Sequence, residues 1–322
     1  MSDQLRWGVI GTGWIAETFA TDLQLTGSGR IVAVGSRAIE SATAFAQRFD
    51  IPNRHDSYEA LVADGDVDAV YVATPHPRHR ADAELALRAG KAVLVEKPFT
   101  MNAAEARELV AIARGQGRFL MEAMWTRFLP HIRRVRELLA EGALGDIVTV
   151  IADHGQWFAK DPKHRLYAPE LGGGALLDLG VYPVSFASMV LGTPARIASI
   201  ITPAFTGVDA TTSMLFEYSS GAQAVLTCTL SAQSPTQAAI VGTRARIEID
   251  GDFYAPSSFT LITRDGERTP FSEPHEGRGL RHEADEVARC LSEGLLESPL
   301  MGLDESISIM ETMDAVLAGG RA

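Results

Sequence analysis

The sequence predicts an α/β protein of two domains, a doubly wound parallel sheet followed by a domain with a large, open, mostly antiparallel sheet. Three observations predict this architecture. The 322 residues exceed what one hydrophobic core ordinarily fills. Up to about residue 122, short apolar runs alternate with helix-patterned stretches. From residue 146, strand-like runs follow one another with short turns rich in Gly, Ser and Asp.

The apolar runs of the first part have strand length and consist mainly of Val, Ile and Leu. Continuous rather than alternating apolar runs are typical of strands covered on both faces. The helical patterns between them supply the crossovers that a parallel sheet requires. The strands expected here are residues 5–11, 30–36, 68–74, 91–96 and 118–123.

The second part begins with a bridging segment, residues 124–144, in which Ile132, Val135 and Leu138 recur at helical spacing. Strands are expected at residues 146–155, 195–202, 211–221, 222–232 and 245–251. A helix is expected within residues 172–192, and two amphipathic helices at 281–294 and 304–317. We therefore place a first domain at residues 1–122 and a second at 123–322, with the C-terminal helices able to pack back on the first.

Composition excludes several classes of partner. The net charge of −12 disfavours phosphate backbones and anionic membranes, so no nucleic acid is expected. No stretch reaches the roughly 18 uninterrupted apolar residues of a membrane span, and the start MSDQLRW has no signal-like apolar core, so we expect a cytoplasmic protein. Cys228 and Cys290 form no metal or redox spacing, and the pair His76 and His79 has no further ligands nearby, so no metal is expected.

A glycine motif follows the first expected strand. In GTGWIA, Gly11 permits a tight turn, Gly13 lets backbone approach a pyrophosphate, and Ala16 keeps the helix close to the sheet. Between a strand and a helix this pattern predicts a Rossmann dinucleotide site, whose phosphates take N–H groups at the helix start. The predicted cofactor contacts of this turn are Gly11, Thr12, Gly13, Trp14 and Ile15.

The end of the second strand indicates which dinucleotide binds. An acidic residue there would hydrogen-bond the ribose 2′-OH, but this chain has Ser36 and Arg37. A guanidinium beside a hydroxyl suits a 2′-phosphate, so NADP is favoured over NAD. The alternative, a solvated Arg at a helix start, stays open.

Two further strand ends carry side chains suited to chemistry. Residues 68–74 run into Pro75-His76-Pro77-Arg78-His79, and residues 91–96 end in Glu96-Lys97-Pro98. Ligands of open parallel sheets bind beyond the carboxyl ends of the strands, where a lysine can hold a carbonyl oxygen and donate a proton. The predicted cofactor contacts at these ends are Thr74, Pro75, His76, His79, Glu96 and Lys97.

Three motifs, GTGWIA, EKP and GGGALLDLGVYP, together resemble the glucose-fructose oxidoreductase / inositol dehydrogenase (Gfo/Idh/MocA) family. The stretches 121–130 and 281–306 look most like its dimeric dihydrodiol dehydrogenase and NADP sugar dehydrogenase branch. The resemblance covers the whole chain and implies an NAD(P)-dependent enzyme acting on CH–OH groups, with Lys97 catalytic, Tyr182 as acid-base catalyst and a homodimer through the second sheet. His76 departs from the family, because many relatives carry Asn there.

The stretch GGGALLDLGVYP has a physical interpretation beside the resemblance. A helix that starts near Gly174 would project Asp178 and Tyr182, at i and i+4, from one face. Tyrosine has an ordinary pKa of about 10, so it needs a cation such as Lys97 to work at neutral pH. Asp178 would bind substrate or fix Lys97, the glycines would let backbone approach the nicotinamide, and Pro183 should bend the helix. The alternative is a packed helix with a buried structural Tyr.

Trp125 and Arg127 are candidate substrate contacts at the domain junction, although they could equally pack and pair structurally. The predicted reaction is reversible hydride transfer between NADP and a small polyol, an aldose, anhydro-sugar or trans-dihydrodiol, or its carbonyl form. A short-chain dehydrogenase is excluded because no YxxxK occurs. NAD-assisted glycoside hydrolysis and a dinucleotide-sensing regulator stay open as alternatives.

Overall fold

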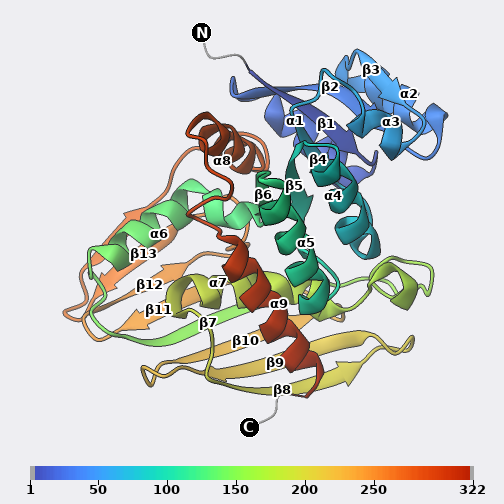
Figure 1. The fold of residues 1–322 in the computed structure, drawn as a ribbon. Coiled ribbons are helices and arrows are strands. Elements are labelled where there is room, and N and C mark those ends of the chain that lie inside the picture. The colour runs from blue at the N-terminus through green and yellow to red at the C-terminus, as the bar shows by residue number, and fades with distance from the viewer. Residues whose placement is uncertain (1–3, 320–322) are drawn as a thin grey trace. The chain divides into compact units, whose positions relative to one another are not determined.

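The computed structural model describes residues 4–319, which form two compact units (Figure 1). The first unit runs through Phe128 and resumes over His275–Ser306. The second consists of Leu129–Pro274 and resumes at Ile307. Each unit therefore combines segments that are far apart in the sequence.

Sheet A of the first unit has six parallel strands in the order β3-β2-β1-β4-β5-β6. Because β1 pairs with both β2 and β4, the winding reverses there, and ligands of such sheets bind beyond the carboxyl ends at that point. This confirms the predicted doubly wound parallel sheet. The strands are β1 (Leu5–Ile10), β2 (Gly29–Gly35), β3 (Asn53–His55), β4 (Ala69–Val72), β5 (Ala92–Glu96) and β6 (Leu120–Ala123).

Helices separate the strands of sheet A as its parallel topology requires. The two ends of α5 show how local sequence sets the bounds of a helix. The Asn102 side chain accepts the Glu105 N–H (3.0 Å) at the start of α5, and Gly117, with its backbone in the left-handed region, ends the helix. The helices of the first unit are α1 (Trp14–Leu23), α2 (Ile39–Phe49), α3 (Tyr58–Val62), α4 (His79–Arg88), α5 (Ala103–Gln116) and α8 (Arg281–Ser292), with short turns η1 (His76–Arg78) and η2 (Trp125–Phe128).

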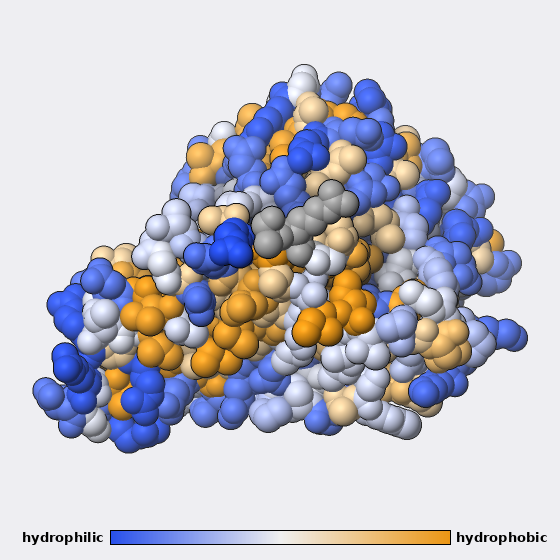
Figure 2. Space-filling view, turned by 90° about the horizontal axis from the view of Figure 1, so that it is seen from below, coloured by the Kyte–Doolittle hydropathy of each residue, from blue (hydrophilic) through white to orange (hydrophobic). Residues whose placement is uncertain are grey.

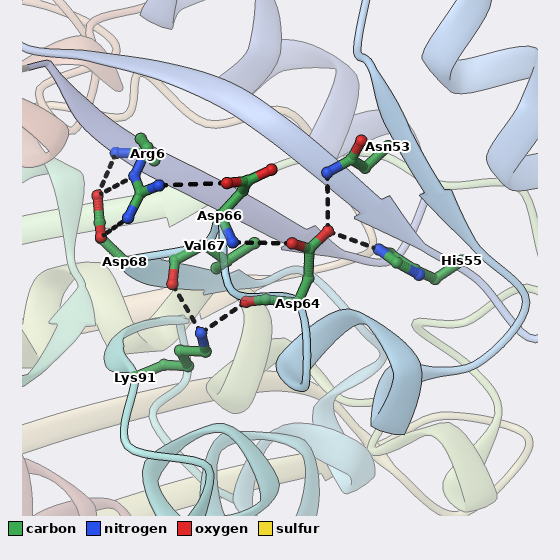
Figure 3. A network of polar contacts seen from close by, with 8 residues as sticks. All are labelled: Arg6, Asn53, His55, Asp64, Asp66, Val67, Asp68 and Lys91. Atoms are coloured by element: carbon green, nitrogen blue, oxygen red, sulfur yellow. Dashed lines mark hydrogen bonds and ion pairs between the residues drawn. The ribbon is translucent and has the colours of Figure 1, made fainter.

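A polar network closes the amino edge of sheet A (Figure 3). Arg6, in β1, donates to both carboxylate oxygens of Asp68, which precedes β4, and holds the pKa of Asp68 below its usual range. Lys91, which precedes β5, donates to the carbonyls of Asp64 and Val67, 2.7 Å each. These groups tie the starts of three neighbouring strands together, so the opposite, carboxyl edge is left for ligands.

Sheet B of the second unit has eight strands in the order β14-β13-β12-β11-β7-β10-β9-β8. Among the strands of residues 4–319 in this sheet, only β7 and β10 pair in parallel, so the sheet is mostly antiparallel, as predicted. Its strands are β7 (Ile147–Gly155), β8 (Arg196–Pro203), β9 (Asp209–Glu217), β10 (Gln223–Thr229), β11 (Ala238–Gly242), β12 (Ala245–Ile249), β13 (Phe259–Thr263) and β14 (Arg268–Phe271). The remaining elements are α6 (Pro130–Ala140), η3 (Pro169–Leu171), the π-helical η4 (Leu176–Gly180), α7 (Val181–Leu191) and α9 (Leu303–Leu317), which begins in the first unit.

Sheet B buries one face and exposes the other. In β9, Phe216 is buried and the preceding Leu215 is exposed; in β10, Leu226 is buried and the preceding Val225 is exposed. The buried face carries α7, which packs on β7 and β10. The stretch Pro169–Leu191, which contains η3, η4 and α7, has the length and mean hydropathy of a membrane span, but 78% of its apolar window is buried inside the protein, as in a core helix.

Candidate active site

The carboxyl edge of sheet A begins with the glycine turn after β1. Gly11 has φ +104°, and a Cβ there would lie 2.7 Å from the Ala73 carbonyl oxygen, so only glycine fits. A Cβ on Gly13 would meet nothing within 4 Å, which leaves open space above the turn. Gly13 also precedes α1 without a side-chain cap, so the helix start offers N–H groups to a ligand. The residues present therefore fit a dinucleotide diphosphate.

The end of β2 lies beside this turn, since Gly11 N–H donates to the Gly35 carbonyl (3.0 Å). Ser36 is half-buried, and Arg37 is exposed beyond the strand, next to Tyr58. No acidic side chain follows the strand directly. The end of β2 therefore presents a hydroxyl and a guanidinium beside the glycine turn.

The end of β4 is held by buried polar contacts. The Thr74 hydroxyl donates to Asp82 (2.8 Å), while Pro75 is exposed and His76 half-buried. His79 is 1% exposed, and its two ring nitrogens lie 2.8 Å from the carbonyl oxygens of Thr74 and Pro98. Burial lowers the pKa of His79, although these two carbonyls act in the opposite direction. The imidazole thus links the end of β4 to the residue after Lys97.

Lys97 follows β5 at the same edge and is half-buried. Its backbone N–H donates to Glu96 (3.1 Å), a buried carboxylate that also accepts the Tyr71 hydroxyl. On the other side of the turn, the Phe99 N–H donates to Glu122 (3.1 Å). The turn that carries Lys97 is therefore fixed through its backbone from both sides.

Glu122 was not among the residues expected at the site. It is 1% exposed on β6, accepts the Ser306 hydroxyl (2.8 Å), and burial raises its pKa to about 7. Arg127 lies near it and acts against that rise. Glu122 reaches the Phe99 N–H because β6 pairs with β5, and no local sequence motif indicates this contact.

Trp125 and Arg127, the candidate substrate contacts, both lie in η2 and are 4% and 1% exposed. The Arg127 guanidinium donates to Glu305 (2.7 Å), at the start of α9, within the same unit. The contact between Arg127 and Glu305 is that of an internal ion pair.

In the second unit the glycines before η4 serve the chain's own packing. A Cβ on Gly173 would lie 2.7 Å from the Leu166 carbonyl oxygen. Gly174 has φ +125°, and a Cβ there would meet the Asp209 carboxylate at 2.2 Å. Asp209 in turn accepts the Leu176 N–H (2.7 Å) and caps the helix start. Gly173 and Gly174 therefore make room for Leu166 and Asp209, and the approach of this backbone to the nicotinamide stays a prediction.

Asp178 and Tyr182 lie where the helix changes its winding. Residues Leu176–Gly180 form a π-helical turn that ends three residues before Pro183, whose ring cannot fit against the carbonyl four residues earlier in a regular α-helix. Asp178, 4% exposed, accepts two hydrogen bonds from Arg165, at 3.0 and 3.1 Å. Arg165 was not expected from the sequence, since it lies 13 positions away in an irregular segment.

The Tyr182 ring belongs to an aromatic cluster. Its centroid lies 5.2 Å from that of His154, on β7, and 4.8 Å from that of Tyr254. His154 stacks on Tyr254 at 4.3 Å, and the Gln156 amide lies 3.0 Å from a His154 ring nitrogen. Tyr182 is 6% exposed, so packing fixes its ring. His154, Gln156 and Tyr254 were missed because no local pattern connects them to Tyr182, which comes from another part of the chain.

The side chains near the sites do not assemble a metal centre. Among residues 4–319, no group of three or more His, Cys, Asp or Glu could hold a metal ion.

Two protein-family models match the chain, one in each part. The model of the oxidoreductase family with an NAD-binding Rossmann fold matches residues 5–124, and that of the GFO/IDH/MocA C-terminal domain matches residues 132–248. Trans-1,2-dihydrobenzene-1,2-diol dehydrogenase from Sus scrofa is 40% identical over 97% of this chain and 96% of its own. The same-named protein from Homo sapiens is 38% identical over 97% and 96%.

Solved structures are similar over almost the whole chain. Aldose-aldose oxidoreductase from Caulobacter crescentus has a TM-score of 0.90 and 26% identity, covering 98% of this chain and 97% of that one. A 3-ketoreductase from Actinomadura kijaniata, in complex with NADP and TDP-benzene, has a TM-score of 0.85 and 29% identity, covering 98% of both chains. That ketoreductase has also been solved with one lysine or one tyrosine replaced. The resemblance seen in the motifs is thus confirmed: the chain belongs to the Gfo/Idh/MocA family of NAD(P)-dependent oxidoreductases, which act on CH–OH groups.

Proposed function

We propose that the protein transfers a hydride reversibly between NADP and a hydroxyl-bearing carbon of a small polyol, an aldose, anhydro-sugar or trans-dihydrodiol. The observation that carries the proposal is the convergence of Gly11, Arg37 and Lys97 on the carboxyl edge of one parallel sheet. Relatives named for diol and sugar oxidoreduction, similar over nearly the full chain, support the substrate class.

The preference for NADP rests on the end of β2. Arg37 is exposed, and its planar guanidinium can bind two oxygens of a 2′-phosphate. The similar ketoreductase was solved with NADP. Gly11, Gly13 and the start of α1 would hold the diphosphate, and Ser36 and Arg37 the 2′-phosphate.

The acid-base chemistry is assigned to Tyr182 and Lys97. During oxidation, the Tyr182 oxygen takes the proton of the substrate hydroxyl, and in reduction it returns that proton to the carbonyl oxygen. The Lys97 ammonium favours the phenolate by its charge. Asp178, held by Arg165, accepts a hydrogen bond from a second substrate hydroxyl and orients the polyol. When bound, the nicotinamide accepts or supplies the hydride.

The deciding experiment is the absorbance of reduced nicotinamide after the protein is mixed with NADP or NAD and a panel of aldoses, anhydro-sugars and trans-dihydrodiols. We expect the band to grow with NADP and one polyol class. Growth with NAD alone would overturn the role of Arg37. Tight cofactor retention with sugar cleavage and no net reduction would instead indicate a glycoside hydrolase, and binding without any turnover a regulator.

We further propose that the protein is a homodimer joined through the outer face of sheet B. Paired positions on adjacent strands place an apolar row across this face: Ala239, Ile151, Val225, Leu215 and Ala198. Ile151 and Val225 are each 47% exposed, and Leu215 is 46% exposed. Figure 2 views the molecule from the side where β8 and β9 lie lowest in Figure 1, and apolar side chains gather on that face. Two copies of one such row can pack face to face about a two-fold axis.

The dimer is tested by light scattering after size-exclusion chromatography. We expect the native protein to have twice the chain mass of 34.6 kDa and the double variant L215E/V225E to have the single mass, because four buried carboxylates would face one another. I39E, at an apolar position of the first unit that is 40% exposed, should remain dimeric. A monomeric native protein would contradict the proposal.

We also propose a cytoplasmic location. Cys228 and Cys290 are free and buried, which supports this proposal.

A further inference from the structure

The segment that leads into α8 is fastened to α1 by one buried carboxylate. Asp22, 1% exposed near the end of α1, accepts the Arg278 N–H at 3.0 Å on each oxygen and the Leu280 N–H at 2.8 Å. A Cβ on Gly277 (φ +71°) would lie 2.3 Å from the Asp22 carboxylate, so the approach requires glycine. The backbone that carries the Arg278 side chain is therefore fixed relative to the cofactor-binding helix.

The Arg278 side chain reaches the first residue of that helix. Its guanidinium carbon lies 5.3 Å from the centroid of the Trp14 ring. Trp14 directly follows the Gly11–Gly13 turn and is 63% exposed, an unusual exposure for a large aromatic residue. Within residues 4–319, no carboxylate forms an ion pair with this guanidinium. The Arg278 guanidinium is therefore a pre-oriented cation without a carboxylate partner, beside the residue that follows the Gly11–Gly13 turn. The protein as a whole has a net charge of −12.

We propose that Arg278 binds the bridging diphosphate of the dinucleotide, with its guanidinium oriented by stacking on Trp14. The proposal rests on the proposed function, because it takes the diphosphate to lie at the start of α1. There the helix offers backbone N–H groups and no side-chain cap, and a guanidinium adds the charge that backbone groups lack. Arg37, at the end of β2, would contact the 2′-phosphate instead. The two arginines therefore bind different parts of the cofactor.

This division of roles is tested by calorimetric titration of NADP and of NAD into the native protein, R278A, R37A and R30A. R278A should weaken both cofactors about tenfold, because both carry the diphosphate, whereas R37A should weaken NADP alone. Arg30, an exposed cation at the amino end of β2, serves as the charge-matched control, and R30A should bind like the native protein. R278A should keep the native melting temperature, since Asp22 contacts only backbone N–H groups of the segment.

The possible failures are distinguishable. Native affinity of R278A for both cofactors would overturn this role of Arg278 and leave the proposed function intact. Loss of NADP affinity alone in R278A would overturn the assignment to the diphosphate. A native protein that binds neither cofactor would overturn the proposed function and this inference with it.

Discussion

Replacing Tyr182 with Phe should lower kcat about a thousandfold while the NADP dissociation constant stays within about twofold of the native value. Phe keeps the ring that packs against His154 and Tyr254 and removes only the hydroxyl. Positioned acid-base groups typically contribute 10²- to 10⁴-fold, and cofactor affinity depends on the other unit's strand ends. The measurement is steady-state turnover with the polyol found in the panel, together with direct titration of NADP.

Tyr218 provides a matched control for this variant. Its hydroxyl is buried without a hydrogen-bond partner in the described chain, and it lies in the same unit as Tyr182. Y218F should therefore leave turnover unchanged. If Y182F retained more than about a tenth of native turnover, the proton acceptor would have to be another group.

Replacing Lys97 with Met should lower kcat/KM at pH 7 by about a thousandfold. Met keeps the length and apolar stem of Lys97 and removes the ammonium. Polyol oxidation needs the tyrosine as phenolate, and without the cation this phenolate forms only nearer the ordinary tyrosine pKa of about 10, so polyol oxidation by K97M should recover in part as pH rises from 7 to 10. The pH–rate profile is the measurement, and it separates loss of the cation from loss of structure.

Lys91 is the contrasting lysine. It lies at the amino edge of sheet A, where it donates to the carbonyls of Asp64 and Val67 (Figure 3). K91M should lower the melting temperature without changing the pH–rate profile, because those carbonyls lose their donor. A K97M profile that keeps the native shape at reduced amplitude would refute the electrostatic role of Lys97.

The strands that consist of a continuous apolar run could be predicted from the sequence. Five of the six strands of sheet A were expected, because each is a continuous buried run. The missing strand, β3, consists of three polar residues at the sheet edge, where pairing depends on β2 and not on composition. In sheet B, β11, β13 and β14 were missed, since short runs such as Arg268–Phe271 become strands only through the neighbour that pairs with them.

The residues of the candidate site likewise fall into those that local motifs indicate and those that they do not. Gly11, Lys97 and Tyr182 could be named from local motifs, because a turn, a strand end and a helix spacing each imply a direction for the residue. Glu122 and Arg165 could not, since each acts through a partner distant in the sequence. The close approach of Asp209 to Gly174 could not be predicted either, because that carboxylate comes from another element.

By itself, the sequence determined the alternation of strands and helices, the glycine turn, and the candidate lysine and tyrosine, because these depend on periodicity and on backbone preferences over a few residues. Only the tertiary structure decided that His79 links two strand ends, that Asp178 is held by Arg165, and that Asp22 fastens the segment carrying Arg278 to α1. The physical reason is that a buried polar side chain is satisfied by whichever group the fold brings within about 3 Å, and distance along the chain does not reveal that group.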